Sequence, residues 1–212
     1  MSVVSPNLRD RVRGLATPVA LAMGRVGLTP NALTLIGFAG TCVAAVAAGL
    51  QAWAVAGILV LVFGVFDMFD GTLARATGKA SRLGAFMDSV FDRWGEGIVY
   101  VGIVAGCVAA GFGEGALLSA AALTSAFMVS YARAKSEGLG FTEGTGMAAV
   151  GLAPREVRIV ILTVGLLWTG LAGDTRPLAA SLGLITILAT ITIIQRVIHV
   201  INQNRQQENT TT

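Results

Sequence analysis

Six long stretches of apolar residues, separated by short clusters of charged residues, glycine and proline, dominate the chain. A helix that crosses a bilayer needs roughly 20 mostly apolar residues, and each stretch has about that length. The pattern therefore predicts six membrane-spanning helices, at residues 31–50, 52–75, 83–111, 115–134, 157–173 and 178–200. The stretch 138–151 is expected to be a loop, and residues 205–212, RQQENTTT, a solvated tail.

Residues 1–29, before the first apolar stretch, carry a helical pattern of another kind. Arg9 and Arg13 lie well away from the apolar side of this pattern. That side comprises Leu8, Val12, Leu15, Val19 and Met23. Such an arrangement is typical of an amphipathic helix in the membrane interface. Pro18 is expected to kink or divide the helix, and a disordered basic tail is the alternative.

The composition indicates a membrane protein. Of the 212 residues, 54% are hydrophobic and only 13% are charged, whereas a soluble domain carries about 25% charged residues. Low apolarity with high charge, the mark of disorder, is also absent. The net charge of +3 is too small to indicate a nucleic-acid partner. We predict one all-α polytopic membrane domain, with the interfacial helix at 1–29, a six-helix bundle at 30–204 and a polar tail at 205–212.

The basic residues predict the orientation of this bundle. Lys and Arg gather before the first span, between the second and third, between the fourth and fifth, and after the sixth. The connections on the opposite side contain only Arg176. Because cytoplasmic loops collect basic residues, we predict a multi-pass protein of the cell (plasma) membrane whose two termini face the cytoplasm.

Four of the six aspartates lie close together in the sequence, at the ends of the second and third predicted spans: Asp67, Asp70, Asp88 and Asp92. Ionisable groups at membrane depth are costly and usually mark function. The first two are three residues apart and the last two are four apart, so each pair shares a helix face. A short connection favours packing of the two helices side by side. The four carboxylates are therefore expected to converge.

Carboxylates without a nearby His or Cys form an oxygen-ligand site for a hard divalent cation such as Mg²⁺ or Mn²⁺. Without a metal, they would repel one another and most would bind protons. A purely structural alternative is that the acids pair with Arg75, Arg82 and Arg93.

The residues between the acids complete a longer motif. Residues 67–92, DMFDGTLARATGKASRLGAFMDSVFD, follow the pattern D-x2-D-G-x2-A-R-x8-G-x3-D-x3-D. This pattern resembles that of the CDP-alcohol phosphotransferase family. The fixed positions are Asp67, Asp70, Gly71, Ala74, Arg75, Gly84, Asp88 and Asp92. The six-span layout and the amphipathic N-terminal helix also resemble the family, so the resemblance covers most of the chain.

The resemblance implies an enzyme that uses two divalent ions, Mg²⁺ or Mn²⁺. It would transfer a phosphoalcohol group from a CDP-linked lipid such as CDP-diacylglycerol to an alcohol, and release CMP. Asp67, Asp70 and Asp88 would bind metal, and Asp92 would be both a ligand and the base that deprotonates the acceptor hydroxyl. The residues implied to bind the nucleotide are Asn31, Thr34, Gly71, Ala74, Arg75, Ser81 and Gly84. Asn31 alternatively only begins the first span with Pro30.

Cations outside the motif bear on the acceptor. Five of them lie near span ends on the predicted cytoplasmic side: Arg133, Lys135, Arg155, Arg158 and Arg196. They favour a phosphorylated acceptor, although Arg133 and Lys135, two apart on a helix, cannot both face it. These positions resemble the branch of the family that uses inositol 1-phosphate, with a diacylglycerol or an archaeal ether-lipid donor. Pro154 replaces an acidic residue common in that branch.

Several alternatives stay open. Inositol 1-phosphate or another polyol phosphate is the favoured acceptor, and glycerol 3-phosphate, which would give a phosphatidylglycerol phosphate synthase, is its rival. A small cation transporter is the alternative from another class. Glu96 either binds acceptor hydroxyls or water, or pairs with Arg93 or an incoming arginine. Membrane lipids surround the chain, and Gly and Ala in the third and fourth spans favour a homodimer.

Overall fold

The computed structural model describes residues 17–141, 147 and 150–211, and the regular elements in these ranges are helices. The prediction of an all-α protein is confirmed. The helices are α2 (Pro30–Gly49), α3 (Trp53–Phe66), α4 (Met68–Ala76), α5 (Arg82–Ala109), α6 (Gly113–Gly138), α7 (Arg155–Ala172) and α8 (Arg176–Thr211).

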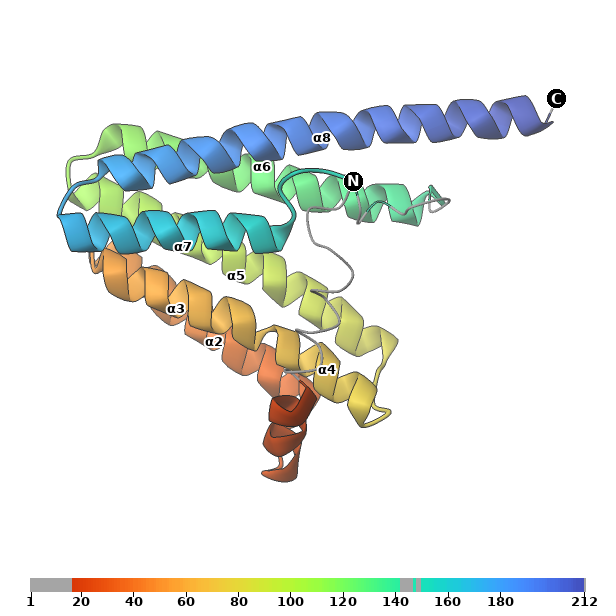
Figure 1. Cartoon of the computed structure of the whole chain (residues 1–212), viewed down its shortest axis with the longest axis horizontal. Coiled ribbons are helices and arrows are strands. Elements are labelled where there is room, and N and C mark those ends of the chain that lie inside the picture. The colour runs from red at the N-terminus through yellow and green to blue at the C-terminus, as the bar shows by residue number, and fades with distance from the viewer. Residues whose placement is uncertain (1–16, 142–146, 148–149, 212) are drawn as a thin grey trace.

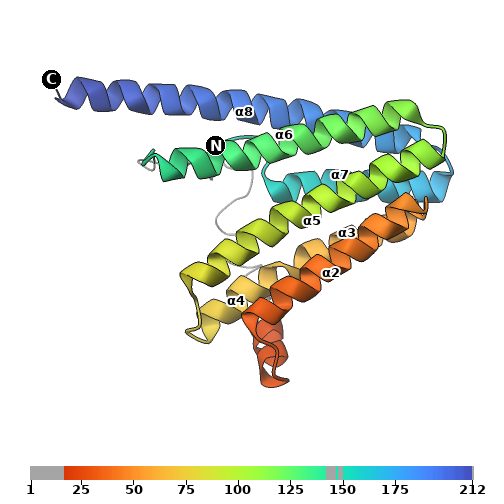
Figure 2. The same ribbon diagram turned by 180° about the vertical axis from the view of Figure 1, so that it is seen from behind.

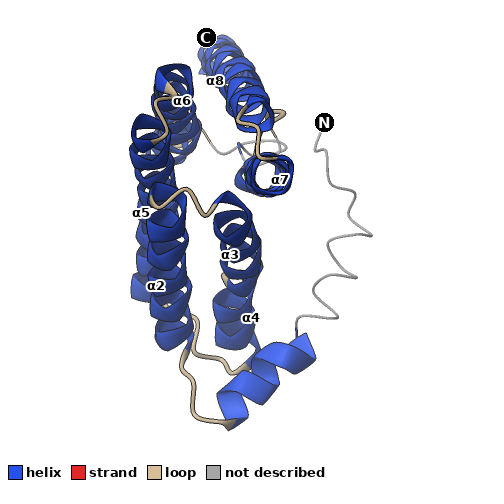
Figure 3. Ribbon diagram, turned by 90° about the vertical axis from the view of Figure 1, so that its left-hand side faces the viewer, coloured by secondary structure: helices blue, strands red, loops and turns tan. Residues whose placement is uncertain are grey.

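The long helices pack in two layers. Helices α2, α5 and α6 form one layer, and α3, α7 and α8 form the other, with α4 continuing from α3 (Figure 3). Helices α5 and α6 are close at their connection and spread apart toward the other end of the bundle (Figures 1 and 2). The starts of α2, α5 and α7 and the helix α4 all lie at one end of the bundle (Figure 1). Side chains from both layers therefore meet at that end.

Four helices have the length and composition to cross a membrane, counted over the described part of the chain. They are Pro30–Gly49, Trp53–Ala76, Gly113–Gly138 and Arg176–Asn209. Helices α5 and α7 are not among them because α5 carries several charged residues and α7 begins with Arg155, Glu156 and Arg158. Large apolar side chains also face outward, and Leu171 is 82% exposed. An apolar exterior of this kind suits a lipid surrounding.

The second predicted span, 52–75, corresponds to the apolar helix Trp53–Ala76, which is tightened at one residue. Helix α3 ends at Phe66 and α4 begins at Met68. Asp67, between them, has a ψ of −23°, which is the value of a tighter 3₁₀ turn. The N–H of Asp67 bonds to the Phe63 carbonyl at 3.2 Å, so the two helices stay nearly in line. The break places the first acid of the motif at the junction.

The last helix is longer than predicted. Helix α8 continues to Thr211, through the segment expected to be a tail, because that segment contains neither Gly nor Pro. The Asn204 Nδ2 donates a hydrogen bond to Glu208 Oε1 at 2.9 Å, one turn further on. Residues 204–209 are nonetheless exposed, so the segment is polar and surface-facing, as expected.

The predicted interfacial helix is described only in part. Leu8, Val12 and Leu15 lie outside the described residues. Residues 17–25 form a helix that lies across the end of the bundle (Figure 3). Its Ala20 is buried against Leu33 of α2 and Leu73 of α4. This contact joins the segment to the end of the bundle where α4 lies.

Helices α2 and α5 approach so closely that glycine is required between them. A Cβ on Gly102 would lie 2.2 Å from the Ala45 carbonyl oxygen, which belongs to the backbone and cannot move aside. Close approach at small residues is the usual basis of helix association in membranes.

We expect Gly102→Val to lower the free energy of unfolding by about 1–3 kcal/mol, the usual cost of overpacking. Denaturation in detergent by increasing SDS would measure it. Gly183→Val is the matched control, because Gly183 also lies within a helix and a Cβ there meets no atom within 4 Å. Equal losses for the two variants would contradict the close approach of α2 and α5.

Candidate active site

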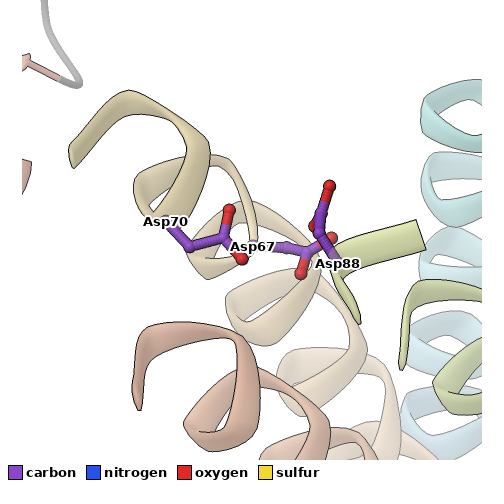
Figure 4. Close-up of side chains that lie close together, drawn as sticks. All are labelled: Asp67, Asp70 and Asp88. Carbon is purple, nitrogen blue, oxygen red and sulfur yellow. The ribbon is translucent and has the colours of Figure 1, made fainter. Parts of the chain in front are cut away.

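Three carboxylates converge at the end of the bundle. One carboxylate oxygen from each of Asp67, Asp70 and Asp88 lies within 4.8 Å of the others. Asp67 comes from the α3–α4 junction, Asp70 from the first turn of α4, and Asp88 from α5, and the carboxylates approach one another (Figure 4). An all-oxygen, all-anionic set of this kind fits a hard divalent cation. We call these three residues the carboxylate cluster.

Asp70 is held in place by two hydrogen bonds. The Thr34 hydroxyl of α2 donates to Asp70 Oδ2 at 2.5 Å, and the Gly71 N–H donates to Oδ1 of the same carboxylate. Asp70 is only 4% exposed. Since a buried carboxylate is costly without such donors, Thr34 fixes the orientation of Asp70 within the cluster.

Asp92 lies outside the cluster and beside an arginine. The Arg155 NH1, at the start of α7, lies 2.5 Å from Asp67 Oδ2 and 3.0 Å from Asp92 Oδ1. Arg93 makes a longer contact of 3.9 Å with Asp92. The chief cation beside the acids is therefore Arg155, which the purely structural alternative did not include. Arg155 joins the α7 layer to the motif.

A cleft opens beside the carboxylate cluster, at the starts of α2 and α5. All seven residues implied to bind the nucleotide line it: Asn31, Thr34, Gly71, Ala74, Arg75, Ser81 and Gly84. Asp70 and Asp88 of the cluster, together with Lys79, also line the cleft. The motif residues between the acids therefore form a wall that adjoins the cluster.

Two of these cleft residues also organise the helix ends. The Ser81 Oγ accepts a hydrogen bond from the Gly84 N–H at 3.0 Å and so caps α5, as Ser commonly does. A Cβ on Gly84 would lie 3.1 Å from that hydroxyl. Pro30 occupies the first position of α2, so the expectation that Pro30 and Asn31 begin the first span also agrees with the structure.

The five cations predicted for the acceptor differ in their surroundings. Arg158 is 1% exposed, and its guanidinium is already engaged. The Nε and NH2 each donate to Glu96 at 2.8 Å, and NH1 donates to the Ala153 carbonyl at 2.8 Å. Glu96 was expected either to bind the acceptor or water, or to pair with an arginine. In the structure it pairs with Arg158. Because the bundle buries both charges, they neutralise each other there.

The other four predicted cations differ in the contacts that their side chains make with protein groups. The Arg196 Nε donates to the Val150 carbonyl at 3.1 Å, and its NH1 donates to the Val129 carbonyl. Arg133 pairs with Glu137 at 2.8 Å, and Lys135 is exposed. Only Arg155, among these five, contacts the aspartates of the motif.

A second, larger space lies between α5 and α6, with a volume of about 1180 Å³. Asp88 and Asp92 line one part of it, and Val101, Leu123 and Phe127 line another. Phe127 is 53% exposed. The acids therefore adjoin both the polar cleft and an apolar groove that is open at the outer face of the bundle.

The sequence of the chain matches known proteins over most of its length. The sequence model of the CDP-alcohol phosphatidyltransferase family matches residues 27–202. The archaetidylinositol phosphate synthase of Pyrococcus horikoshii is 35% identical over 192 residues, which cover 90% of this chain and 93% of the relative. The phosphatidylinositol phosphate synthase of Mycobacteroides abscessus is 32% identical over 193 residues, covering 89% and 84% of the two chains.

The fold also matches solved structures. The crystal structure of the phosphatidylinositol phosphate synthase of Mycobacterium tuberculosis with CDP-DAG bound has a TM-score of 0.77 and 27% sequence identity. The match covers 87% of this chain and 92% of that one. A structure of the same protein with manganese and citrate also has a TM-score of 0.77. Sequence, fold and motif agree, and the chain belongs to the CDP-alcohol phosphatidyltransferase family.

Proposed function

We propose that the chain transfers a phosphatidyl group, or its ether-lipid equivalent, from a CDP-linked lipid to inositol 1-phosphate and releases CMP. One observation carries the proposal: the carboxylate cluster lies between the cleft lined by the motif and the guanidinium of Arg155. A nucleotide on one side and an anionic acceptor on the other would meet at the cluster. The names of the relatives point to the same reaction.

The aspartates have separate roles in this proposal. Asp67, Asp70 and Asp88 hold two divalent cations, Mg²⁺ or Mn²⁺. When bound, such ions stabilise charge on the attacking and leaving oxygens of a phosphoryl transfer. Asp92, beside the cluster, accepts the proton of the acceptor hydroxyl. The Thr34 hydroxyl holds the Asp70 carboxylate in its orientation. Thr34 therefore contributes to metal binding through Asp70.

The cleft binds the cytidine diphosphate end of the donor. Arg75 has the planar set of donors that suits phosphate oxygens. Asn31 and Ser81 supply polar groups, and the small residues leave room for the nucleotide to approach the backbone. A Cβ on Gly71 would lie 3.2 Å from the Arg75 guanidinium, so glycine also leaves this guanidinium space. The apolar groove between α5 and α6 suits the lipid tails.

The acceptor phosphate binds on the opposite side of the cluster. Arg155 is the cation nearest the reacting groups and contacts the phosphate directly. Arg196, whose guanidinium donates to two neutral backbone carbonyls, adds positive charge, as do Lys135 and Arg133. The charge of Arg158 is balanced by Glu96, so Arg158 does not bind the acceptor. It stabilises the site by its hydrogen bond to the Ala153 carbonyl.

The two-layer bundle supports a proposal for the membrane arrangement. We propose six spans: the four apolar helices, together with α5 and α7, whose charged residues lie at the end of the bundle that holds the cluster. The basic residues gather at that same end, which favours the cytoplasmic side of the plasma membrane for the site and both termini. Residues 1–29 lie in the interface, 30–204 form the bundle, and two copies of the chain form a homodimer.

A panel of acceptors tests the proposed reaction. We expect purified protein with CDP-diacylglycerol and Mg²⁺ or Mn²⁺ to release CMP with inositol 1-phosphate, and at least about tenfold more slowly with inositol, because Arg155 loses its phosphate partner. CMP is measured by chromatography, and omission of the acceptor is the control. If glycerol 3-phosphate were the one acceptor in the panel that supported CMP release, the chain would be a phosphatidylglycerol phosphate synthase. Metal flux through vesicles without any CMP release would instead identify a transporter.

A further inference from the structure

The chain just before α7 is held by side chains of α7 and α8. Residues 150–153 lie between the loop after α6 and Pro154, the N-cap of α7. Thr192 and Arg196 of α8 hydrogen-bond to this segment on one side. Arg158, paired with Glu96 of α5, bonds to the Ala153 carbonyl. An irregular segment with this many tertiary hydrogen bonds has a fixed position.

The Thr192 hydroxyl uses its whole hydrogen-bonding capacity. It donates to the Leu188 carbonyl at 2.8 Å and accepts from the N–H groups of Leu152 and Ala153, each at 3.0 Å. A hydroxyl has one donor and two acceptor lone pairs, so none remains. Thr192 is fully buried. The two consecutive amides would have no partner within helix α7, because both lie before its start.

The methyl group of Thr192 fits against the same segment. Gly151 has a φ of +124°, a conformation that L side chains rarely adopt, and a Cβ there would lie 2.2 Å from Thr192 Cγ2. Glycine at residue 151 therefore lets the backbone lie directly on Thr192. Both groups of the side chain, hydroxyl and methyl, contact residues 151–153.

Arg155 is two residues beyond Ala153. The position of its guanidinium, 2.5 Å from Asp67 and 3.0 Å from Asp92, depends on where α7 begins. Pro154 fixes its own φ near −65°, and its φ in the structure is −61°, so the backbone has little freedom between the held segment and Arg155. A shift of residues 152–153 would therefore move the backbone that carries Arg155.

We propose that Thr192 is a positioning residue for Arg155 and acts through the amides of residues 152 and 153. The proposal rests on the proposed role of Arg155 in binding the acceptor phosphate. Thr192 does not touch the reacting groups. It lies on α8, far from the motif in the sequence, and it sets the affinity for the acceptor without affecting the affinity for the CDP-lipid.

Two substitutions separate the hydroxyl from the shape of Thr192. Thr192→Val keeps the shape and removes the acceptor oxygen, whereas Thr192→Ser keeps the oxygen. We expect Thr192→Val to raise the KM for inositol 1-phosphate about tenfold, because a small misplacement of a binding group weakens its contacts. The KM for CDP-diacylglycerol should stay within twofold. Thr192→Ser should restore most of the acceptor affinity.

Thr190→Val is the matched control. Thr190 lies two residues away on α8, is exposed, and donates only within its own helix, to the Thr186 carbonyl. We expect it to leave both KM values unchanged. If Thr192→Val changed the two KM values equally, or changed neither, the positioning role would be overturned.

Hydrogen exchange gives a second measurement that does not depend on turnover. In Thr192→Val, the peptide that covers residues 150–157 should exchange its amide hydrogens faster, and in Thr192→Ser and Thr190→Val it should exchange as in the parent chain. Unchanged exchange in Thr192→Val would overturn the proposal. A parent chain that released no CMP with inositol 1-phosphate would instead refute the proposed function, with the exchange result still informative about Thr192.

Discussion

Replacing Asp88 with asparagine is expected to reduce CMP release at saturating substrate by at least about 100-fold, the scale of losing one group that stabilises transition-state charge. Asp88 is the member of the carboxylate cluster that α5 contributes. Asparagine keeps the size of the side chain but removes its charge and one of its oxygens. The initial rate of CMP release, measured over a series of Mn²⁺ concentrations, tests the expectation.

Asp174→Asn is the control for the Asp88 variant. Asp174 is exposed, lies in the connection between α7 and α8 at the opposite end of the bundle, and contacts Arg176 rather than the motif. It should retain full activity. Paramagnetic resonance of Mn²⁺ adds a binding measurement, in which Asp88→Asn should bind the ion more weakly. If Asp88→Asn kept the parental activity and Mn²⁺ affinity, Asp88 would not be a metal ligand.

The second large effect concerns the buried pair of Glu96 and Arg158. Arg158→Met should lower the free energy of unfolding by about 3–5 kcal/mol, because the carboxylate of Glu96 loses its partner inside the bundle. Glu96→Leu should have a similar effect, since it leaves the guanidinium without a counter-ion. The double variant should recover much of the loss, because two apolar side chains replace two charges. Denaturation by SDS in detergent measures all three variants.

An exposed pair provides the comparison. Arg133 and Glu137 are joined at 2.8 Å, but their side chains are 43% and 42% exposed. Arg133→Met should therefore cost less than about 1 kcal/mol, because water screens and solvates such a pair. If the losses from the two single variants of the buried pair simply added in the double variant, the two charges would not be acting as a pair. The double variant also loses the hydrogen bond of Arg158 to the Ala153 carbonyl, so its recovery should be incomplete.

The acidic motif could be predicted well from the sequence because its chemistry is local. The spacing of Asp67, Asp70 and Asp88 places them on the facing sides of two helices joined by a short connection. The helices that carry them were predicted to within a few residues, except for the break at Asp67. A helix tightened at one residue leaves no sign in the hydrophobic pattern, since the flanking residues are equally apolar.

The partners of the arginines could not be predicted, because they depend on contacts between distant parts of the chain. Arg155, Arg158 and Arg196 look alike in the sequence, as cations near span ends. Their different environments arise from the packing of α7 against α3 and α8 and from the pairing of Arg158 with Glu96 of α5. Thr192 gave no signal either, since a single threonine within an apolar stretch is common in helices that pack together.

The length of α8 has a practical consequence for experiments on this chain. Its 36 residues extend about 54 Å at 1.5 Å per residue, well beyond the roughly 30 Å of a hydrocarbon core. The final turns project past the neighbouring helices (Figure 1). A fluorophore or affinity tag attached there would stand off from the rest of the molecule, leaving both the cleft and the groove free for substrates.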